Sequence, residues 1–135
     1  MAFWLFKQEP SCYSLADLER DRRTTWDGVS NSLALKNLGQ VHRGDRIFFY
    51  HTGTQKAVVG EMRAIDDPRP VADNPKGLVV EVEFVRALPR PVTLAEIKSD
   101  KSFAHWDLIR LPRLSVVQVT ATQWRRIEQL SKKAG

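Results

Sequence analysis

A run of apolar and aromatic residues near the middle of the chain restricts the fold most strongly. The run from Ile47 to Tyr50 is opened by Gly44-Asp45 and closed by His51-Thr52-Gly53. A short apolar run between turn residues is typical of a buried strand. Side chains alternate along a strand, so both faces of this one are largely apolar at the middle. We therefore expect a strand inside a small barrel, or inside a sheet covered by helices, with polar side chains delivered at its end.

Patterns along the rest of the chain indicate short strands and short capped helices. Ser14 with Asp17, and Thr93 with Glu96, have the spacing of a helix N-cap and its partner. The strands expected are Phe3–Lys7, Ile47–Tyr50, Ala57–Val59 continuing through 61–65, Leu78–Val85 and Leu114–Val119. The helices expected are Leu15–Arg20, Ser32–Leu38 with Gly39 as its cap, 93–98, a turn or two in 103–108, and a C-terminal helix after Thr120. We expect loops at 20–31 and 66–76, and we expect Pro89 and Pro91 to end the strand before them. This order predicts an α+β fold, with a curled mixed sheet or small β-barrel flanked by short helices.

Length and composition point to one compact domain over residues 1–135. Its single cysteine, Cys12, excludes an internal disulfide framework and indicates a reducing compartment. No apolar run approaches membrane-spanning length, so we expect a cytoplasmic protein without a membrane partner. The formal net charge of +5 is compatible with a polyanionic partner such as nucleic acid.

Catalytic and metal-binding signatures are largely absent from the sequence. It contains no Gly-x-Ser-x-Gly elbow, no P-loop, no Gly-x-Gly-x-x-Gly and no His-Glu-x-x-His. The histidines, His42, His51 and His105, are far apart along the chain, and a lone histidine is more often structural than a ligand. We therefore expect no metal and no cofactor, and a binding module in preference to an enzyme.

Aromatic residues outside periodic patterns are the stronger functional signal. Trp26 lies in a turn-rich segment, where it is a candidate to line a pocket; a tryptophan that plugs one end of the sheet is an equal alternative. Trp4 and Trp124 fall on periodic stripes and are expected in the core. A nucleobase needs a flat apolar face and a few polar groups at its edge. The residues that supply both kinds are Trp26, Asn31, Tyr50, His51 and Thr52, although each has a structural alternative as a cap, a turn residue or a buried ring.

Several separate motifs together resemble one known family. These are Trp4-Leu5-Phe6-Lys7-Gln8-Glu9-Pro10, Trp26-Asp27-Gly28-Val29-Ser30-Asn31, Gly44-Asp45 before Phe49-Tyr50-His51-Thr52, Val59-Gly60-Glu61 and Arg113-Leu114-Ser115-Val116. In this order, and over nearly the whole chain, they resemble the EVE domain family, whose members include thymocyte nuclear protein. The chain departs from the family where Ser30 replaces a usual arginine and Gln118 a usual proline, and where 71–76 lacks a tyrosine-proline pair.

The resemblance implies a PUA-like fold, related to YTH domains, and a reader of modified bases such as methylated cytosine or adenine in DNA or RNA. By that resemblance Trp26 is a wall of an aromatic cage and Asn31 reads a polar edge of the base. The pocket residues implied are Lys7, Glu9, Trp26, Asn31, Tyr50, His51, Thr52, Leu114 and Ser115. The candidate phosphate contacts are Arg43, Arg46 and Arg113. The alternative is a small amidohydrolase-like enzyme on a modified nucleoside, in which Lys7 and Glu9 supply nucleophile-activating and acid-base groups.

Overall fold

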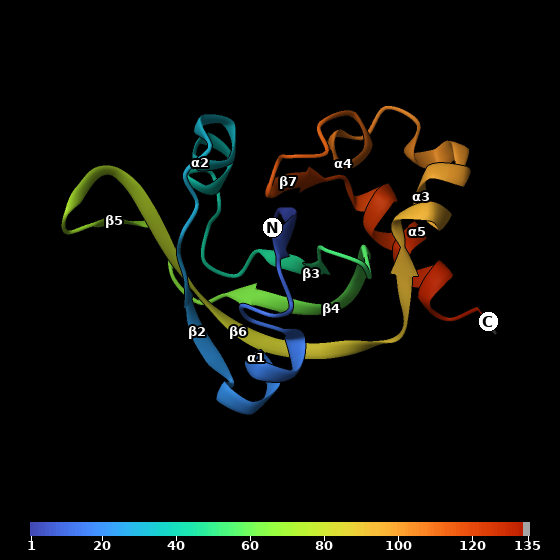
Figure 1. Ribbon diagram of the computed structural model, residues 1–135, viewed down its shortest axis with the longest axis horizontal. Coiled ribbons are helices and arrows are strands. Elements are labelled where there is room, and N and C mark those ends of the chain that lie inside the picture. The colour runs from blue at the N-terminus through green and yellow to red at the C-terminus, as the bar shows by residue number, and fades with distance from the viewer. Residues whose placement is uncertain (134–135) are drawn as a thin grey trace.

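The computed structural model describes residues 1–133 and has an α+β fold (Figure 1). A strongly curled sheet forms the centre of the molecule; in the view of Figure 1, α1 lies below it, α2 lies above it at the left, and the C-terminal helices lie at the right. The strands are β1 (Phe3–Gln8), β2 (Arg23–Trp26), β3 (Arg46–His51), β4 (Ala57–Ala64), β5 (Arg69–Val71), β6 (Asn74–Thr93) and β7 (Val116–Val119). The helices are α1 (Leu15–Asp21), α2 (Ser32–Leu38), α3 (Leu94–Ser99), α4 (Asp107–Arg110) and α5 (Ala121–Ser131), with a 3₁₀ turn at Lys101–Phe103.

The sheet is mixed and does not close on itself. Its strand order is β2-β6-β4-β3-β1-β7, and β5 pairs with β6 beside this path. The strands β1 and β3 are parallel, whereas β1 is antiparallel to β7 and β3 to β4. The expected curled mixed sheet with flanking short helices is thereby confirmed; a closed barrel, the other form considered, is not formed.

Local capping signals determine where the helices begin. The Ser14 hydroxyl accepts from the Asp17 N–H, and the Asp17 carboxylate accepts from the Ser14 N–H. The same reciprocal pair forms at Thr93 and Glu96 at the start of α3. These interactions satisfy backbone N–H groups that the first helical turn leaves without partners. Both helix starts expected from these pairs are confirmed.

The prediction missed two strands, β2 and β5, which lie in segments expected as loops, and it made β6 too short at both ends. β2 was expected as a loop, but its residues pair with the middle of β6, with Thr24 opposite Val82. β6 was expected to end before Pro89 and Pro91, yet it continues to Thr93. It does so because the β4–β6 register shifts between Val58 and Gly60, so both prolines lie in a bulge, where a missing N–H donor is tolerated.

The core forms on both faces of β1 and β3. On one face the indole of Trp124 stacks on Phe48 with ring centroids 3.6 Å apart. On the opposite face Trp26 packs against Phe6 and Phe49, with centroids 5.5 and 5.3 Å away. Trp4 is 3% exposed and Trp124 is 1% exposed, so their expected place in the core is confirmed.

The helices of residues 1–133 are short, and none of them combines the length and apolar character needed to span a membrane.

Candidate functional site

The carboxyl ends of the parallel strands β1 and β3 carry several of the expected pocket residues. Lys7 lies beside Tyr50 in the β1–β3 register, and Gln8 lies beside His51. Because side chains alternate, the first pair faces the side of α3 and α4 while the second pair faces the side of α1. Three hollows open around this end, and we name each by the side chains that distinguish it.

The Trp26 hollow has a volume of about 300 Å³ and lies on the Gln8 side of β1. Its lining residues are Gln8, Cys12, Tyr13, Thr24, Thr25, Trp26 and Asp27. The indole of Trp26 is only 4% exposed, because Phe6 and Phe49 cover most of its surface. Trp26 is thus mainly a core residue, and the part of it that remains open contributes to the wall of this hollow.

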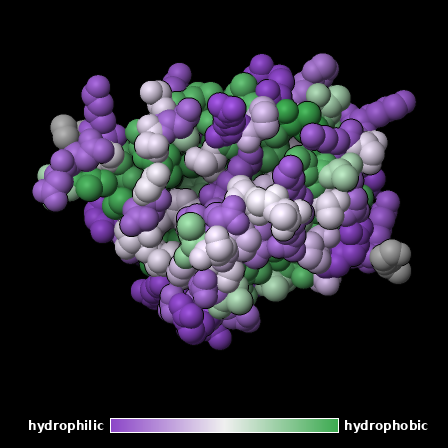
Figure 2. Space-filling view, in the orientation of Figure 1, coloured by the Kyte–Doolittle hydropathy of each residue, from purple (hydrophilic) through white to green (hydrophobic). Residues whose placement is uncertain are grey.

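The arginine hollow has a volume of about 330 Å³ and lies between the start of α2 and the segment after α4. Its lining residues are Asn31, Leu33, Arg110, Leu111, Pro112, Arg113 and Leu114. The Asn31 side chain accepts from the Ala34 N–H at 3.0 Å, so it caps α2 as well as lining the hollow. Figure 2 shows apolar surface between α2 and α4, surrounded by hydrophilic residues. This hollow therefore combines an apolar floor with two guanidinium groups.

The lysine hollow has a volume of about 220 Å³ and lies on the Tyr50 side of β1. Its lining residues are Lys7, Tyr50, Thr52, Gly53, Lys56, Leu94, Lys98, Leu108 and Pro112. The Lys7 ammonium donates to the Pro112 carbonyl at 2.9 Å and lies 5.5 Å from the centre of the Tyr50 ring. Burial lowers the pKa of Lys7 and raises the pKa of Tyr50 to about 12.

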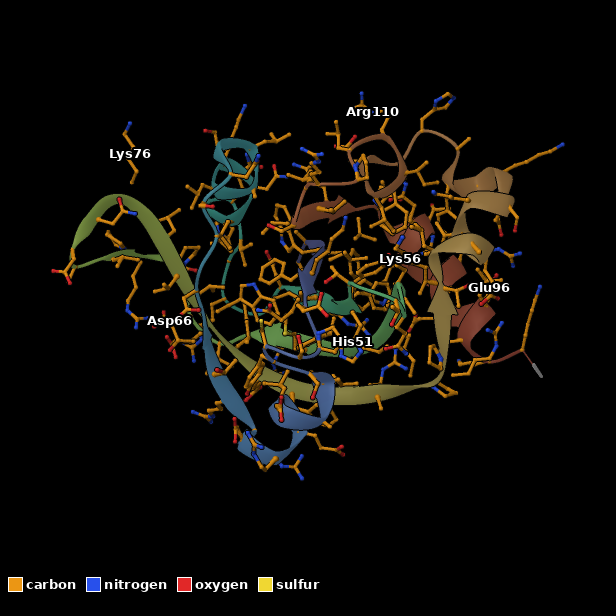
Figure 3. All side chains as sticks on the ribbon, in the orientation of Figure 1. His51, Lys56, Asp66, Lys76, Glu96 and Arg110 are labelled. Carbon is orange, nitrogen blue, oxygen red and sulfur yellow. The ribbon has the colours of Figure 1, made fainter. Side chains whose placement is uncertain are left out.

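The remaining expected pocket residues lie outside the hollow linings. His51 is engaged structurally, because its Nε2 accepts from the Leu15 N–H at 3.1 Å and its Nδ1 contacts Gln55 Oε1 at 2.7 Å. Figure 3 shows His51 within the body of the sheet, next to α1. Glu9 accepts from the Thr52 hydroxyl at 3.2 Å, and the Ser115 carbonyl accepts from the Lys7 N–H. The structure therefore divides the expected pocket residues among three neighbouring hollows and the sheet beneath them.

The three candidate phosphate contacts have different environments. Arg113 is exposed in the arginine hollow. Arg43 is exposed at the other end of the sheet, in a hollow that it shares with Arg23 and Arg63. Arg46 is committed to Glu61, with two contacts of 2.7 and 3.0 Å. Of the three, only Arg113 lies at the carboxyl end of β1.

Sequence reasoning missed several residues that line the hollows. Tyr13 and Thr24 join the Trp26 hollow because β2 carries Trp26 into the sheet, and β2 was expected as a loop. Lys56 and Lys98 join the lysine hollow from the β3–β4 turn and from α3. Charged residues in turns and short helices carry no signal of where they converge. Only pairing across distant segments could have revealed them.

Comparison with known proteins places this arrangement in a family. The sequence profile of the EVE domain matches residues 2–130. Human thymocyte nuclear protein 1 is 32% identical, in an alignment that covers 71% of this chain and 55% of that protein. The chain thus spans about half the length of the curated relatives it matches.

Solved structures give the same picture. A protein of Rhodopseudomonas palustris has a TM-score of 0.91 and 32% identity, covering 97% of this chain and 93% of that one. The human THYN1 protein, solved in complex with 5-methylcytosine containing DNA, has a TM-score of 0.92 and 27% identity, covering 100% of both chains. An ASCH protein of Zymomonas mobilis, at 11% identity and a TM-score of 0.58, shares the fold alone. The profile match over residues 2–130 and the identity to thymocyte nuclear protein 1 establish that this chain belongs to the EVE domain family.

Proposed function

We propose that this chain is a nucleic-acid-binding module and that it takes a modified base, such as 5-methylcytosine, into the Trp26 hollow. One observation carries the proposal. An aromatic wall and unpaired hydrogen-bonding groups meet in a hollow of about 300 Å³ at the carboxyl end of β1. The human THYN1 chain that was solved with 5-methylcytosine containing DNA has the same fold over the full extent of that solved chain, and this supports the assignment.

The lining of the Trp26 hollow suits a planar heterocycle with a polar edge. Tyr13 and Trp26 offer aromatic surface for stacking. The Trp26 indole N–H has no acceptor among residues 1–133, whereas that of Trp4 donates to Asp45 at 2.9 Å. Asp27 is exposed and can accept from the exocyclic amine of cytosine or adenine.

The Gln8 side chain adds a donor to the same hollow. Its Oε1 accepts from the Glu9 N–H at 3.0 Å, which leaves the amide –NH₂ group free to donate. A carboxylate acceptor and an amide donor side by side match the amine and the ring nitrogen of a cytosine edge. The pair would therefore favour a base that carries an amine over uracil or thymine.

The arginine hollow supplies phosphate contacts next to the base. The segment from Asp27 to Asn31 joins the two hollows, since Asp27 lines one and Asn31 the other. A strand whose base enters the Trp26 hollow would cross this segment and meet Arg113. The Arg113 side chain has no carboxylate partner among residues 1–133, so its charge is available to a phosphate. Phosphate contacts of this kind make binding fall as salt rises.

Binding to matched oligonucleotides tests the proposal. We expect a strand with one 5-methylcytosine to bind more tightly than the unmodified strand in fluorescence anisotropy. Gln8→Ala and Asp27→Asn should each weaken binding of the modified strand about tenfold, the loss expected for one base-edge contact. Gln129→Ala and Asp66→Asn, which change the same residue types at exposed positions elsewhere, should bind it as the wild type does. Equal affinity of all five proteins for the modified strand would contradict the proposed base site.

A second candidate function, hydrolysis of a modified nucleoside, has one observation in its favour. Burial lowers the pKa of Lys7, which increases the neutral fraction that can act as a base or nucleophile. Glu9 lies nearby along β1 but is bonded to Thr52. Incubation with modified nucleosides, followed by mass spectrometry, tests this function. Product formation abolished by Lys7→Met would favour the enzyme over the binding module.

A further inference from the structure

The lysine hollow concentrates positive charge on the face of the sheet opposite the Trp26 hollow. Lys7, Lys56 and Lys98 line it from β1, from the β3–β4 turn and from α3. Figure 3 shows Lys56 at that turn, on the side of the sheet that faces the C-terminal helices. No carboxylate is among the residues that line the hollow. Three segments that are distant in sequence thus bring ammonium groups to one small cavity.

These lysines differ from most of the arginines in the chain. Arg46, Arg86 and Arg90, for example, each lie within 3 Å of a carboxylate oxygen. Within residues 1–133, no carboxylate lies within 4.0 Å of the ammonium groups of Lys7, Lys56 or Lys98. The Lys7 ammonium donates to a neutral group, the Pro112 carbonyl. The charge of the hollow is therefore not neutralised by direct ion pairs in the described part of the chain.

A tyrosine hydroxyl borders the same cavity. Tyr50 is 3% exposed and lines the hollow, and its hydroxyl has no hydrogen-bond partner among the described residues. The hydroxyl is not among the enclosed polar atoms that lack a partner, so it is accessible to water or to a ligand in the hollow. The floor beside it is apolar, from Leu94 and Leu108. This combination provides a neutral O–H donor in addition to the ammonium groups.

The backbone holds Lys56 in place at the rim. Its φ of 46° lies in the left-handed region, which residues other than glycine rarely adopt. The Lys56 carbonyl accepts from the Leu94 N–H at 2.8 Å, which ties the turn to the start of α3. The turn is thereby fixed next to the helix that carries Lys98. This hydrogen bond therefore links the backbone segments that carry Lys56 and Lys98, two of the three lysines of the hollow.

One carboxylate lies at the edge of the hollow. Glu9 accepts from the Thr52 hydroxyl, and its Oε1 lies 2.8 Å from the position that a Cβ of Gly53 would occupy. Thr52 and Gly53 both line the hollow, so Glu9 sits behind its wall. Its charge opposes anion binding without occupying the cavity. Removing that charge should therefore strengthen the binding of an anion.

We propose that the lysine hollow is a phosphate-binding site. Three ammonium groups and a phenolic O–H donor converge on a cavity of about 220 Å³, and tetrahedral oxyanions accept from several such donors at once. The phosphate belongs either to a bound strand or to a free nucleotide. The site is separate from base recognition, because Lys7 and Gln8 project from β1 toward opposite faces of the sheet.

Titration with inorganic phosphate and cytidine 5′-monophosphate, with cytidine as the phosphate-free control, tests the site by ¹H–¹⁵N NMR. We expect both phosphates to shift the amide signals of Thr52 and Gly53 saturably, and cytidine to leave them unchanged. The double variant Lys56→Gln with Lys98→Gln should weaken phosphate binding about tenfold or more, since two charged contacts are lost. Lys36→Gln with Lys132→Gln removes the same charge elsewhere and should bind as the wild type does. Shifts elsewhere, or equal binding by both double variants, would overturn the proposal.

Glu9→Gln provides a test of opposite sign. Loss of its charge should tighten phosphate binding, while thermal melting shows that the variant is folded. Weaker binding by this folded variant would contradict the proposed role of the lysines. A general loss of structure would weaken phosphate binding in both kinds of variant. A charged site predicts weaker binding by the lysine double variant and tighter binding by Glu9→Gln.

An oligonucleotide with an abasic centre identifies the source of the phosphate. If the strand supplies it, the lysine double variant should bind this oligonucleotide more weakly, with a salt slope reduced by about 1.4 for two contacts to a single strand. If a free nucleotide supplies the phosphate, the double variant should bind cytidine 5′-monophosphate more weakly and should bind the abasic oligonucleotide as the wild type does. Either result supports the site. Failure of the base hypothesis would appear separately, as an unchanged affinity of Gln8→Ala for the 5-methylcytosine strand.

Discussion

The two ends of the parallel strands β1 and β3 differ in whether their charged side chains are bonded to partners within the fold. At the amino end, Asp45 is 3% exposed and accepts from the Ala2 N–H, the Trp4 indole and the His42 N–H at 2.9 to 3.0 Å. All three hydrogen bonds are made by groups of the protein itself. Such a saturated buried carboxylate is a structural element, because its remaining capacity for a ligand is small.

A second network begins at the same end, with Arg46 at the start of β3. Glu61 is 2% exposed and receives Arg46 at 2.7 Å and Arg86 at 2.9 Å. Arg86 also contacts Glu128, and the Arg46 guanidinium lies 4.9 Å from the centre of the Trp124 ring. The cations here are committed to carboxylates and to an indole. They stabilise the packing of α5 on the sheet.

The carboxyl end has the same kinds of residues in a different arrangement. Trp26 is nearly as buried as Trp124, but it borders a hollow, whereas the Trp124 Nε1 is enclosed without a partner. Lys7 has a carbonyl and a ring as neighbours where Arg46 has a carboxylate. Burial alone therefore does not distinguish the residues of the amino-end networks from those that border the candidate hollows. The pairing of their charges does.

The largest expected effect belongs to the amino end. Glu61→Ala would leave two arginines without their buried partner, so we expect the free energy of unfolding to fall by about 3 kcal/mol. Glu19→Ala, at an exposed site on α1, should change it by less than about 0.5 kcal/mol. Urea unfolding measures both. Loss of oligonucleotide binding by the folded Glu61 variant would break the separation of the two ends.

The two buried tryptophans provide a matched pair. Trp26→Phe and Trp124→Phe both keep a ring in the core, so each should lower stability by about 1–2 kcal/mol. Only Trp26→Phe should weaken binding of a 5-methylcytosine strand, by about tenfold, because stacking on an aromatic contributes about 1–3 kcal/mol per base. Anisotropy well below the melting temperature measures the difference. Equal losses in both variants would remove the distinction between them.

Two exposed arginines compare the ends directly. Arg113→Gln at the carboxyl end should reduce the slope of log K against log salt by about 0.7 on single strands, the value for one phosphate contact. Arg43→Gln at the amino end should leave the slope unchanged, because about six residues of strand, or roughly 20 Å, separate the two ends. Arg125→Gln on α5 serves as the control for net charge. A reduced slope for Arg43→Gln would extend the interface to the amino end.

The smallest effect is acid sensitivity beside the lysine hollow. Arg90, with the N-terminal turn of α3, lowers the pKa of Glu96 to about 2. A depressed carboxyl pKa stabilises the fold above the unfolded value of about 4.3, and this stabilisation is lost as pH falls toward 2. The advantage of the wild type over Glu96→Gln should shrink across that window, by roughly 1 kcal/mol or less for a partly exposed pair. A constant difference from pH 7 to pH 2 would contradict this linkage.

Local signals predicted much of the fold but not its longest pairings. The helix starts at Ser14 and Thr93 depend on contacts three residues apart, so spacing alone was sufficient. β2 is short and polar, and its partner in β6 is far along the chain. Pro89 and Pro91 were expected to end β6, because a bulge that accommodates them is a property of two strands together. Local periodicity cannot contain that information.

The candidate site was predicted as a set of residues and not as an arrangement. Motifs singled out Lys7, Trp26 and Asn31, and all three border hollows at the carboxyl end of β1. They border different hollows because side chains alternate along β1, and because the segment after β2 runs from the Trp26 hollow to the arginine hollow. The place of Lys98 depends on how α3 packs, which no short-range pattern in the sequence encodes.

The most direct test of the account is an NMR map of a bound strand on the ¹⁵N-labelled protein. Addition of a single strand with one 5-methylcytosine should shift the Trp26 indole N–H and the amides of Gln8 and Asp27 most, and more than the unmodified strand does. The amides of Asp45 and Arg46 at the amino end should move little. The account is contradicted if the largest shifts fall at Asp45 and Arg46, or if the Trp26 indole signal is indifferent to both strands.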